Sequence, residues 1–387
     1  MHQNEEGTFQ RSGRRPLIAA TDARAEPVGP GRRLALAQWR RGSLDGPHDP
    51  TGRAAPRKDL FEDLYARTYD EASLDEGECG LFARRLPRWV RLGMDIVRRA
   101  DEYDAIVTWS ERITLAVMSM QRFSRAPKPH IAMMYWLSRP MVQCGLRAFG
   151  HTLRSIITWS SVQRSYAIEH LQIPARNIHL VKHFVDQLFW RPQEGPYDMI
   201  CSAGAEMRDY RTLFEALSGT GVPCHIATDH VRIDCFGVAR RLGAATLFRQ
   251  AGAVGADLSI GRKSPVELRD LYARSRFVVV PLQRSDTDNG VSVILEAMAM
   301  GKPVIVSRTR GQVDVIEEGV TGLFVPVGDA RALRSAILAL WNDPDRAAAM
   351  GRAARVAAVG SHALEKFCSD VKRAIDASLE QAIDSTK

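Results

Sequence analysis

Short apolar runs alternate with longer amphipathic segments along most of this chain. Such runs predict buried strands, and segments with apolar residues three or four positions apart predict helices. The strands expected in the first half are 34–38, 105–108, 131–134, 155–158 and 178–181, with helices between them. Strands that alternate with helices in this order form a parallel sheet covered by helices. The first half is therefore predicted to be a doubly wound α/β domain.

A second alternation begins after 189–196, FWRPQEGP, whose prolines and glycine indicate a crossing between domains. The strands expected beyond it are 199–203, 225–227, 258–260, 277–280, 304–306 and 323–325, and the helices are about 209–218, 265–274, 291–300, 329–342 and 344–358. We expect two Rossmann-like domains, 31–191 and 192–360, facing each other across a cleft. A helix at about 361–380 could pack back on the first domain, and the polar residues 1–30 are expected to form a disordered tail.

Composition narrows the class of protein. The 387 residues are 45% hydrophobic and 25% charged, as in ordinary soluble domains, and no apolar run approaches the ~20 residues of a spanning helix. The N-terminus lacks the apolar stretch of a signal peptide, so a cytoplasmic location is expected. The net charge of +8 comes from arginines spread along the chain, without the basic and aromatic platform that indicates a nucleic-acid partner.

Two further patterns bear on partners. Segment 82–99 places apolar residues on one helical face and arginines elsewhere, which fits a helix packed on a core better than a helix resting on an anionic membrane. A peripheral contact with the inner face of a membrane stays open as the alternative. The six cysteines lie without metal-ligand spacing, so we expect reduced thiols and no metal site.

The most informative segment is 288–328, DNGVSVILEAMAMGKPVIVSRTRGQVDVIEEGVTGLFVPVG, which predicts a loop, a helix, a strand and a glycine turn. Glu296 lies in the helix among apolar residues, so burial of its carboxylate calls for a partner such as a hydroxyl-rich ligand. Gly290 allows the backbone to approach a ligand closely, and the amides that open the helix can face a phosphate group. We therefore predict a ligand site at the start of this helix.

From about Asp104 to Gly360 the chain resembles the retaining, nucleotide-sugar-dependent glycosyltransferases of the GT-B fold, known as the group 1 type or glycosyltransferase family four. The resemblance is strong in the second half, in SAGAEMRDYRTLFEAL from Ser202, ELRDLYARSRFVVVPL from Glu267, the 288–328 segment and DPDRAAAMGRAAR from Asp343. It is weaker from Ser155 to Pro192. It implies an acceptor-side domain followed by a donor domain.

The resemblance implies roles for individual residues. Glu296 would hold the ribose hydroxyls of the nucleotide, and Asp288, where the family usually has glutamate, would lie near the transferred sugar. Arg208 is the first candidate for the cation that stabilises the departing diphosphate, ahead of Arg211. Backbone close to the donor would come from Gly204, Asn289, Gly290, Val291 and Ser292.

The acceptor half departs from the family pattern, because neither the family's glycine-rich loop nor its histidine is evident. The residues that could line an acceptor pocket at the strand ends are Trp109, Glu111, Tyr135 and Trp136. Aromatic packing within the core is the equally weighted alternative for this group.

The expected function is transfer of a sugar, with retention, from a UDP- or GDP-sugar to a polysaccharide, glycolipid or small-molecule acceptor. Amides and arginines would hold the donor diphosphate, so no cofactor or metal is expected, and the letters Asp286-Thr287-Asp288 are taken as an accidental metal motif. A GT-B protein that binds nucleotide sugars without turnover is the alternative. A nicotinamide-dependent dehydrogenase is disfavoured, since the Gly-x-Gly-x-x-Gly turn it needs is missing.

Overall fold

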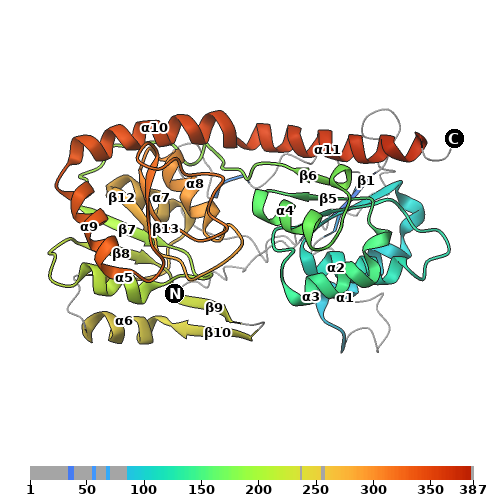
Figure 1. Ribbon diagram of the computed structural model, residues 1–387, viewed down its shortest axis with the longest axis horizontal. Helices are drawn as coiled ribbons and strands as arrows, with labels where there is room; N and C mark the ends of the chain where they lie inside the picture. The colour runs from blue at the N-terminus through green and yellow to red at the C-terminus, as the bar shows by residue number, and fades with distance from the viewer. Residues whose placement is uncertain are drawn as a thin grey trace, which may run out of the picture.

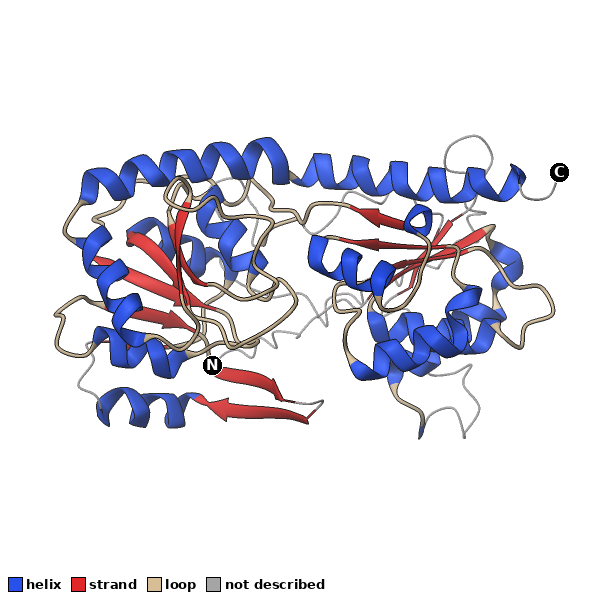
Figure 2. Ribbon diagram, in the orientation of Figure 1, coloured by secondary structure: helices blue, strands red, loops and turns tan. Residues whose placement is uncertain are grey.

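The computed structural model describes residues 34–38, 55–57, 67–69, 85–235, 238–253 and 258–384. Within them the chain forms two α/β domains that lie side by side, and the helices α10 (Pro344–His362) and α11 (Leu364–Asp384) run along both (Figure 1). Helices cover the faces of the sheet in each domain (Figure 2). The predicted fold class is confirmed. The expected tail of residues 1–30 lies outside the described residues.

The N-terminal domain holds a six-stranded parallel sheet in the order β2-β1-β3-β4-β5-β6. Its strands are β1 Leu34–Gln38, β2 Arg67–Tyr69, β3 Ala105–Trp109, β4 His130–Met133, β5 Ser155–Thr158 and β6 Ile178–Leu180. Its helices are α1 Arg88–Arg98, α2 Glu111–Gln121, α3 Pro140–Phe149 and α4 Ser161–Glu169, with the short 3-10 turns η3 Ala100–Glu102, η4 Gly150–Thr152 and η5 Ala175–Asn177.

The C-terminal domain holds a second six-stranded parallel sheet in the order β11-β8-β7-β12-β13-β14. Its strands are β7 Met199–Ala203, β8 Cys224–Ala227, β11 Leu258–Ile260, β12 Ser275–Val280, β13 Val304–Ser307 and β14 Gly322–Val325. Its helices before α10 are α5 Tyr210–Leu217, α6 Ala244–Ala253, α7 Pro265–Arg274, α8 Val291–Ala299 and α9 Ala330–Trp341. An antiparallel hairpin, β9 His230–Cys235 and β10 Val238–Gly243, stands apart from this sheet.

The segment between 228 and 257 differs from the sequence expectation. No element was predicted there, and the structure places β9, β10 and α6 in it. Strand β2 was also not predicted. By contrast, segment 82–99 was expected to form a helix packed on the core, and α1 is such a helix. Its buried residues are Leu92, Gly93 and Ile96, and Gly93 lies directly against α2, since a Cβ there would meet Ala116 Cβ at 2.9 Å. That face of α1 is therefore covered by protein.

The C-terminal helix α11 belongs to the core of the N-terminal domain, although it follows the C-terminal domain in the chain. Leu364, Phe367, Val371 and Ile375 are buried in one cluster with residues of β3, β4 and β5. The crossing segment is fixed at the same place, where the Arg57 side chain binds Asp186 with Nη2–Oδ1 at 2.7 Å and also Glu365 on α11. The two domains are thus joined by both chain crossings.

Among the described residues, no helix is both long and apolar enough to cross a membrane.

Candidate functional site

The candidate site lies where the carboxyl ends of β7 and β12 meet. Strand order runs outward from β7 to β8 on one side and from β12 to β13 on the other, so β7 and β12 flank the switch point at which open α/β sheets bind ligands. The loop after β7 carries Gly204 and Arg208, and the loop after β12 leads through Asp288 into α8. These loops face the N-terminal domain.

Helix α8 positions the centre of the site. It is almost wholly apolar, and Ile294, Leu295, Ala297 and Met298 are fully buried between the sheet and α10. Gly290 precedes it with φ +90°, a left-handed conformation that favours glycine. The Val291 N–H donates to the Asp288 carbonyl at 3.0 Å, so the later amides of the first turn provide the free positive end of the helix.

The Arg208 guanidinium occupies the space between the two glycine loops. It is buried, at 4% exposed, and its Nη1 lies 3.2 Å from the position that a Cβ on Gly290 would take. A Cβ on Gly204, whose φ is +95°, would overlap the same guanidinium. Both loops therefore need glycine to admit this side chain.

Arg208 is held by carbonyl groups. Its Nε donates to the Ala203 carbonyl at 2.9 Å and its Nη1 to the Glu206 carbonyl at 2.8 Å. Burial lowers the pKa of Arg208, while Tyr210 and then Tyr272, Glu206 and Glu296 oppose that shift. No described carboxylate lies within ion-pairing distance, so a buried positive charge is left to attract an anion.

Glu296 lies one helical turn beyond the start of α8, on the same side as Arg208. Its Oε2 accepts a hydrogen bond from the Tyr272 hydroxyl at 3.0 Å. Burial raises the pKa of Glu296 to about 7, against the opposing effects of this hydrogen bond and of Arg208. Its other carboxylate oxygen remains able to accept hydrogen bonds from neighbouring hydroxyl groups.

Asp288 lies at the boundary between the domains and is 6% exposed. The Thr287 hydroxyl is 3.2 Å from Asp288 Oδ1 and 3.0 Å from the Tyr135 carbonyl of the N-terminal domain. Burial raises the pKa of Asp288 to about 6, and the negative charge of Asp314 adds to the shift. The neighbouring Asn289 supports the loop, because its Nδ2 donates to Ser285 Oγ at 2.7 Å.

Arg211 and Ser292 are placed differently from the other donor-side candidates. The Arg211 side chain is 80% exposed and pairs with Glu215 one turn along α5. The structure therefore brings Arg208, Gly204, Gly290 and Glu296 together and leaves Arg211 outside the cluster. Ser292 is exposed at the start of α8, beside the buried Val291.

Among the candidates in the N-terminal domain, Glu111 supports a loop. Its Oε1 accepts the backbone N–H groups of Tyr135 at 2.9 Å and Trp136 at 3.1 Å. Burial raises the pKa of Glu111, and these two hydrogen bonds oppose that shift. The carboxylate thus fixes the segment that follows β4, at the edge of the sheet that faces the C-terminal domain.

The aromatic candidates form one cluster with residues that were not singled out in the sequence. Tyr135 stacks on Trp159 with ring centroids 6.1 Å apart, and Trp109 packs edge-on against Trp159 and Phe184. Trp109 and Tyr135 remain partly exposed, whereas Trp136 is 8% exposed. At this edge of the sheet the aromatic side chains therefore pack against one another, and some of them are also partly open to solvent.

Hydrogen bonds join the two domains directly beside the site. Trp136 Nε1 donates to Asp286 Oδ1 at 3.2 Å, and Gln163 Nε2 donates to the Asp286 carbonyl at 2.7 Å. The Ser161 N–H and hydroxyl both donate to the Asp314 carboxylate, at 2.8 and 2.6 Å. Sequence reasoning missed Gln163 and Asp314, and it noticed Asp286 only as part of an accidental motif. The serine pair that opens α4 after β5 was the available signal.

Part of the second domain matches a known protein family. Residues 256–357 match the family described as "Glycosyl transferases group 1". The D-inositol 3-phosphate glycosyltransferase of Arthrobacter sp. (strain FB24) is 32% identical over 133 residues, 34% of this chain and 31% of that protein. The chain thus matches about a third of this curated relative's length.

Solved structures resemble both domains. Sucrose-phosphate synthase from Thermosynechococcus elongatus matches with a TM-score of 0.68 and 15% identity over 92% of this chain and 100% of that chain. Anabaena HepE in complex with UDP-glucose matches with a TM-score of 0.65 and 15% identity over 89% of this chain and 99% of that chain. The chain therefore has the GT-B fold.

Proposed function

We propose that this chain, whose residues 256–357 match the group 1 glycosyltransferases and which has the GT-B fold, is a glycosyltransferase that transfers a sugar from a nucleotide diphosphate sugar to a hydroxyl group of an acceptor. The observation that carries the proposal is the buried Arg208 guanidinium, held between Gly204 and Gly290 at the N-terminus of α8 and close enough to Glu296 to affect its pKa. A diphosphate and a ribose are ligands of matching chemistry.

The donor diphosphate is bound by Arg208 together with the amides of the first turn of α8. The helix N-terminus and a guanidinium both favour negative charge, and their effect is largest on the charge that develops when the sugar leaves. Glu296 accepts hydrogen bonds from the ribose hydroxyls. The donor is a substrate, UDP- or GDP-linked, and with arginine and amides to neutralise the diphosphate the reaction needs no metal or cofactor. UDP and UDP-glucose complexes of the structurally similar HepE support a nucleotide-sugar donor.

Transfer proceeds with retention of the sugar's configuration. Asp288 lies beside the transferred sugar and stabilises the positive charge that develops on it, which requires its carboxylate to be ionised. The acceptor hydroxyl approaches from the N-terminal domain on the same face as the leaving diphosphate, and a phosphate oxygen takes its proton. The partly exposed Tyr135 and Trp109 form the acceptor wall and stack on an acceptor ring.

The acceptor is a polysaccharide, a glycolipid or a small glycoside, and the enzyme acts in the cytoplasm. A lipid-linked acceptor would bring it to the inner face of the membrane. The name of the D-inositol 3-phosphate glycosyltransferase relative supports an acceptor with several hydroxyl groups.

The proposal is tested by measuring donor hydrolysis and transfer over a panel of UDP- and GDP-sugars for the wild type and Glu296→Gln. We expect wild-type turnover with at least one donor, and a loss of about tenfold or more in kcat/KM for the variant, since a ribose-binding carboxylate is lost. Exposed Glu169→Gln on α4 serves as a matched control and should keep wild-type kinetics. Unchanged turnover in Glu296→Gln would contradict the site, and nucleotide binding without any turnover would instead indicate a binding protein.

A further inference from the structure

The N-terminal domain has two adjoining depressions on the side away from the candidate site. The first encloses about 310 Å³ between the end of α3, η4, the start of β5 and the turn before η5, and the second encloses about 460 Å³ between the α2–β4 connection and η4. His151, Leu153 and Arg154 line both, so the two depressions form one continuous surface.

This surface lies at the amino ends of the parallel strands. Its residues immediately precede β4 and β5, whereas the segments that contact the donor domain, at Tyr135 and Ser161, follow the same two strands. The amino and carboxyl ends of parallel strands are at opposite edges of a sheet. A ligand bound here therefore leaves the candidate site free.

The lining is strongly basic. Four cationic side chains line the two depressions, Arg122, Lys128, Arg147 and Arg154, and among the described lining residues there is no aspartate or glutamate. None of the four forms an ion pair with a described carboxylate. Unlike Arg57, whose charge is matched by Asp186 and Glu365, these four side chains carry charge that no described carboxylate neutralises. Arg154 donates its Nε to the Ser378 carbonyl on α11 at 3.0 Å, which leaves its Nη groups for a ligand.

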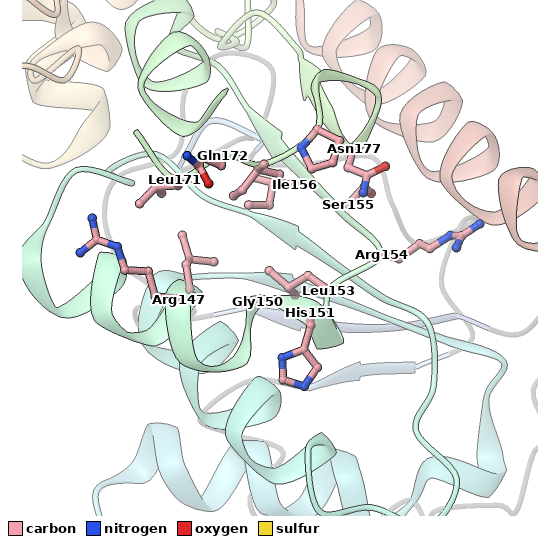
Figure 3. A pocket seen from close by; sticks show the side chains of 13 residues that line it. Arg147, Gly150, His151, Leu153, Arg154, Ser155, Ile156, Leu171, Gln172 and Asn177 are labelled. Atoms are coloured by element: carbon pink, nitrogen blue, oxygen red, sulfur yellow. The ribbon is translucent and has the colours of Figure 1, made fainter. Parts of the chain in front are cut away.

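The floor of the first depression is apolar. Figure 3 shows Arg147 and Arg154 toward its two ends, with Leu153 and Ile156 between them and His151 at one side. In the second depression Gln121, which is 3% exposed, accepts the Lys128 N–H at 2.7 Å, and its Nε2 has no acceptor among the described residues. Guanidinium, ammonium and amide donors around a small depression are the groups that proteins use to bind phosphate oxygens.

The geometry points to a second binding site on this surface, for a ligand that carries a phosphate group. Arg147 binds the phosphate oxygens at one end of the first depression, and Arg154, which lines both depressions, and Lys128 extend the positive surface into the second. The same phosphate chemistry is offered by a free phosphorylated compound and by the headgroup of an anionic phospholipid. The site is independent of the proposed sugar transfer, because none of its residues lies in the cleft.

Binding is tested with Arg208→Gln as the parent protein, so that phosphate binding at the proposed donor site contributes as little as possible to the signal. Calorimetry with inorganic phosphate and pyrophosphate probes the soluble source, and co-sedimentation with phosphatidylglycerol vesicles, against phosphatidylcholine vesicles, probes the lipid source. The site variant adds Lys128→Gln and Arg147→Gln, whose side chains make no bond to a described residue and can change without loss of folding. Adding Arg331→Gln and Arg352→Gln, two exposed arginines of the C-terminal domain, gives a control of equal charge.

We expect the parent and the control variant to bind at least one of the phosphate probes, and the site variant to bind it at least about tenfold more weakly, as loss of charge-assisted hydrogen bonds implies. Binding of the soluble anions alone identifies a free phosphorylated ligand, and binding of the anionic vesicles alone identifies a lipid. Failure of both probes to bind, or an equal loss in the site and control variants, would overturn the proposal.

Discussion

At the scale of single residues, the position of Arg208 explains why glycine occurs at two positions far apart in the sequence. Gly204 follows β7 and Gly290 precedes α8, and both adopt positive φ with the Arg208 guanidinium packed against them. A side chain at either position would displace the guanidinium that carries the proposed diphosphate contact. Under the proposed function, the two glycines therefore affect donor binding through the position of Arg208.

Gly290→Ala is expected to weaken donor binding by about tenfold or more. The added Cβ would lie 3.0 Å from Val280 Cγ1 and 3.2 Å from Arg208 Nη1, so the guanidinium must shift. Gly219→Ala is the matched control, because Gly219 also has positive φ, +68°, but no atom within 4 Å of the new Cβ. Both variants should lose about 1–2 kcal/mol of stability from the backbone conformation. Equal donor affinity in the two variants, measured by calorimetry, would argue against the guanidinium as the contact.

Glu296 should make stability depend on pH in a defined direction. Its pKa is about 7 in the folded protein against an ordinary value of 4.5, so between these pH values the folded state holds a proton that the unfolded chain has lost. The protonated Glu296 therefore contributes to the free energy of unfolding at low pH, and this contribution is lost as the pH rises from about 4.5 through about 7. Glu296→Gln resembles the protonated form and should be more stable than the wild type at pH 8, with a smaller difference at pH 4.

Urea midpoints at the two pH values measure this effect. A variant that is less stable than the wild type at pH 8 would show that Glu296 is stabilised as a carboxylate and that burial does not control its pKa.

At the scale of elements, the β12–α8 loop with Asp286 and the β13–β14 loop with Asp314 contact the start of α4 and the segment after β4. The Asp314 carboxylate accepts two hydrogen bonds from Ser161 at the N-terminus of α4, where negative charge is also favoured by the helix dipole. Asp286 adds the contacts to Trp136 and Gln163. These bonds hold the loop that carries Asp288 against the segment after β4 that carries Tyr135.

Asp314→Ala is expected to slow sugar transfer by about tenfold while nucleotide affinity stays within about twofold of the wild type. The variant loses two charge-assisted hydrogen bonds between the domains but touches no residue of the Arg208–Glu296 cluster. Exposed Asp345→Ala, at the start of α10, is the matched control. A parallel fall in nucleotide affinity would show that Asp314 acts on the donor site itself.

The elements themselves were largely predictable, because parallel strands buried on both faces give continuous apolar runs such as FVVV in β12. The hairpin β9–β10 and α6 were not, since HVRIDC and VARRLG carry alternating polar residues without the glycine or asparagine pair of a tight turn. Glu296 and Gly290 were singled out from their place in the chain and Arg208 from the family resemblance, and the structure brings the three together. The role of Glu111 could not be found, because its partners are backbone groups of a loop 24 and 25 residues away.

At the scale of the whole molecule, the chain crosses between domains twice. It passes from the first domain to the second near Asp186 and returns through α11, whose apolar face completes the first domain's core. The two domains are therefore joined at one side by these crossings and beside the candidate site by the Asp286 and Asp314 contacts. This arrangement sets the C-terminal domain, in which residues 256–357 match the group 1 glycosyltransferases, against the aromatic cluster of Trp109, Tyr135 and Trp159 in the N-terminal domain.

The central claim, that Arg208 binds the diphosphate of a nucleotide, is tested most directly by titrating UDP, UMP, GDP and GMP into the wild type and Arg208→Gln by calorimetry. We predict that one nucleoside diphosphate binds the wild type more tightly than its monophosphate, and that Arg208→Gln loses about tenfold or more in affinity for the diphosphate while its affinity for the monophosphate changes little. Equal losses for both nucleotides, or no loss for the diphosphate, would contradict the account.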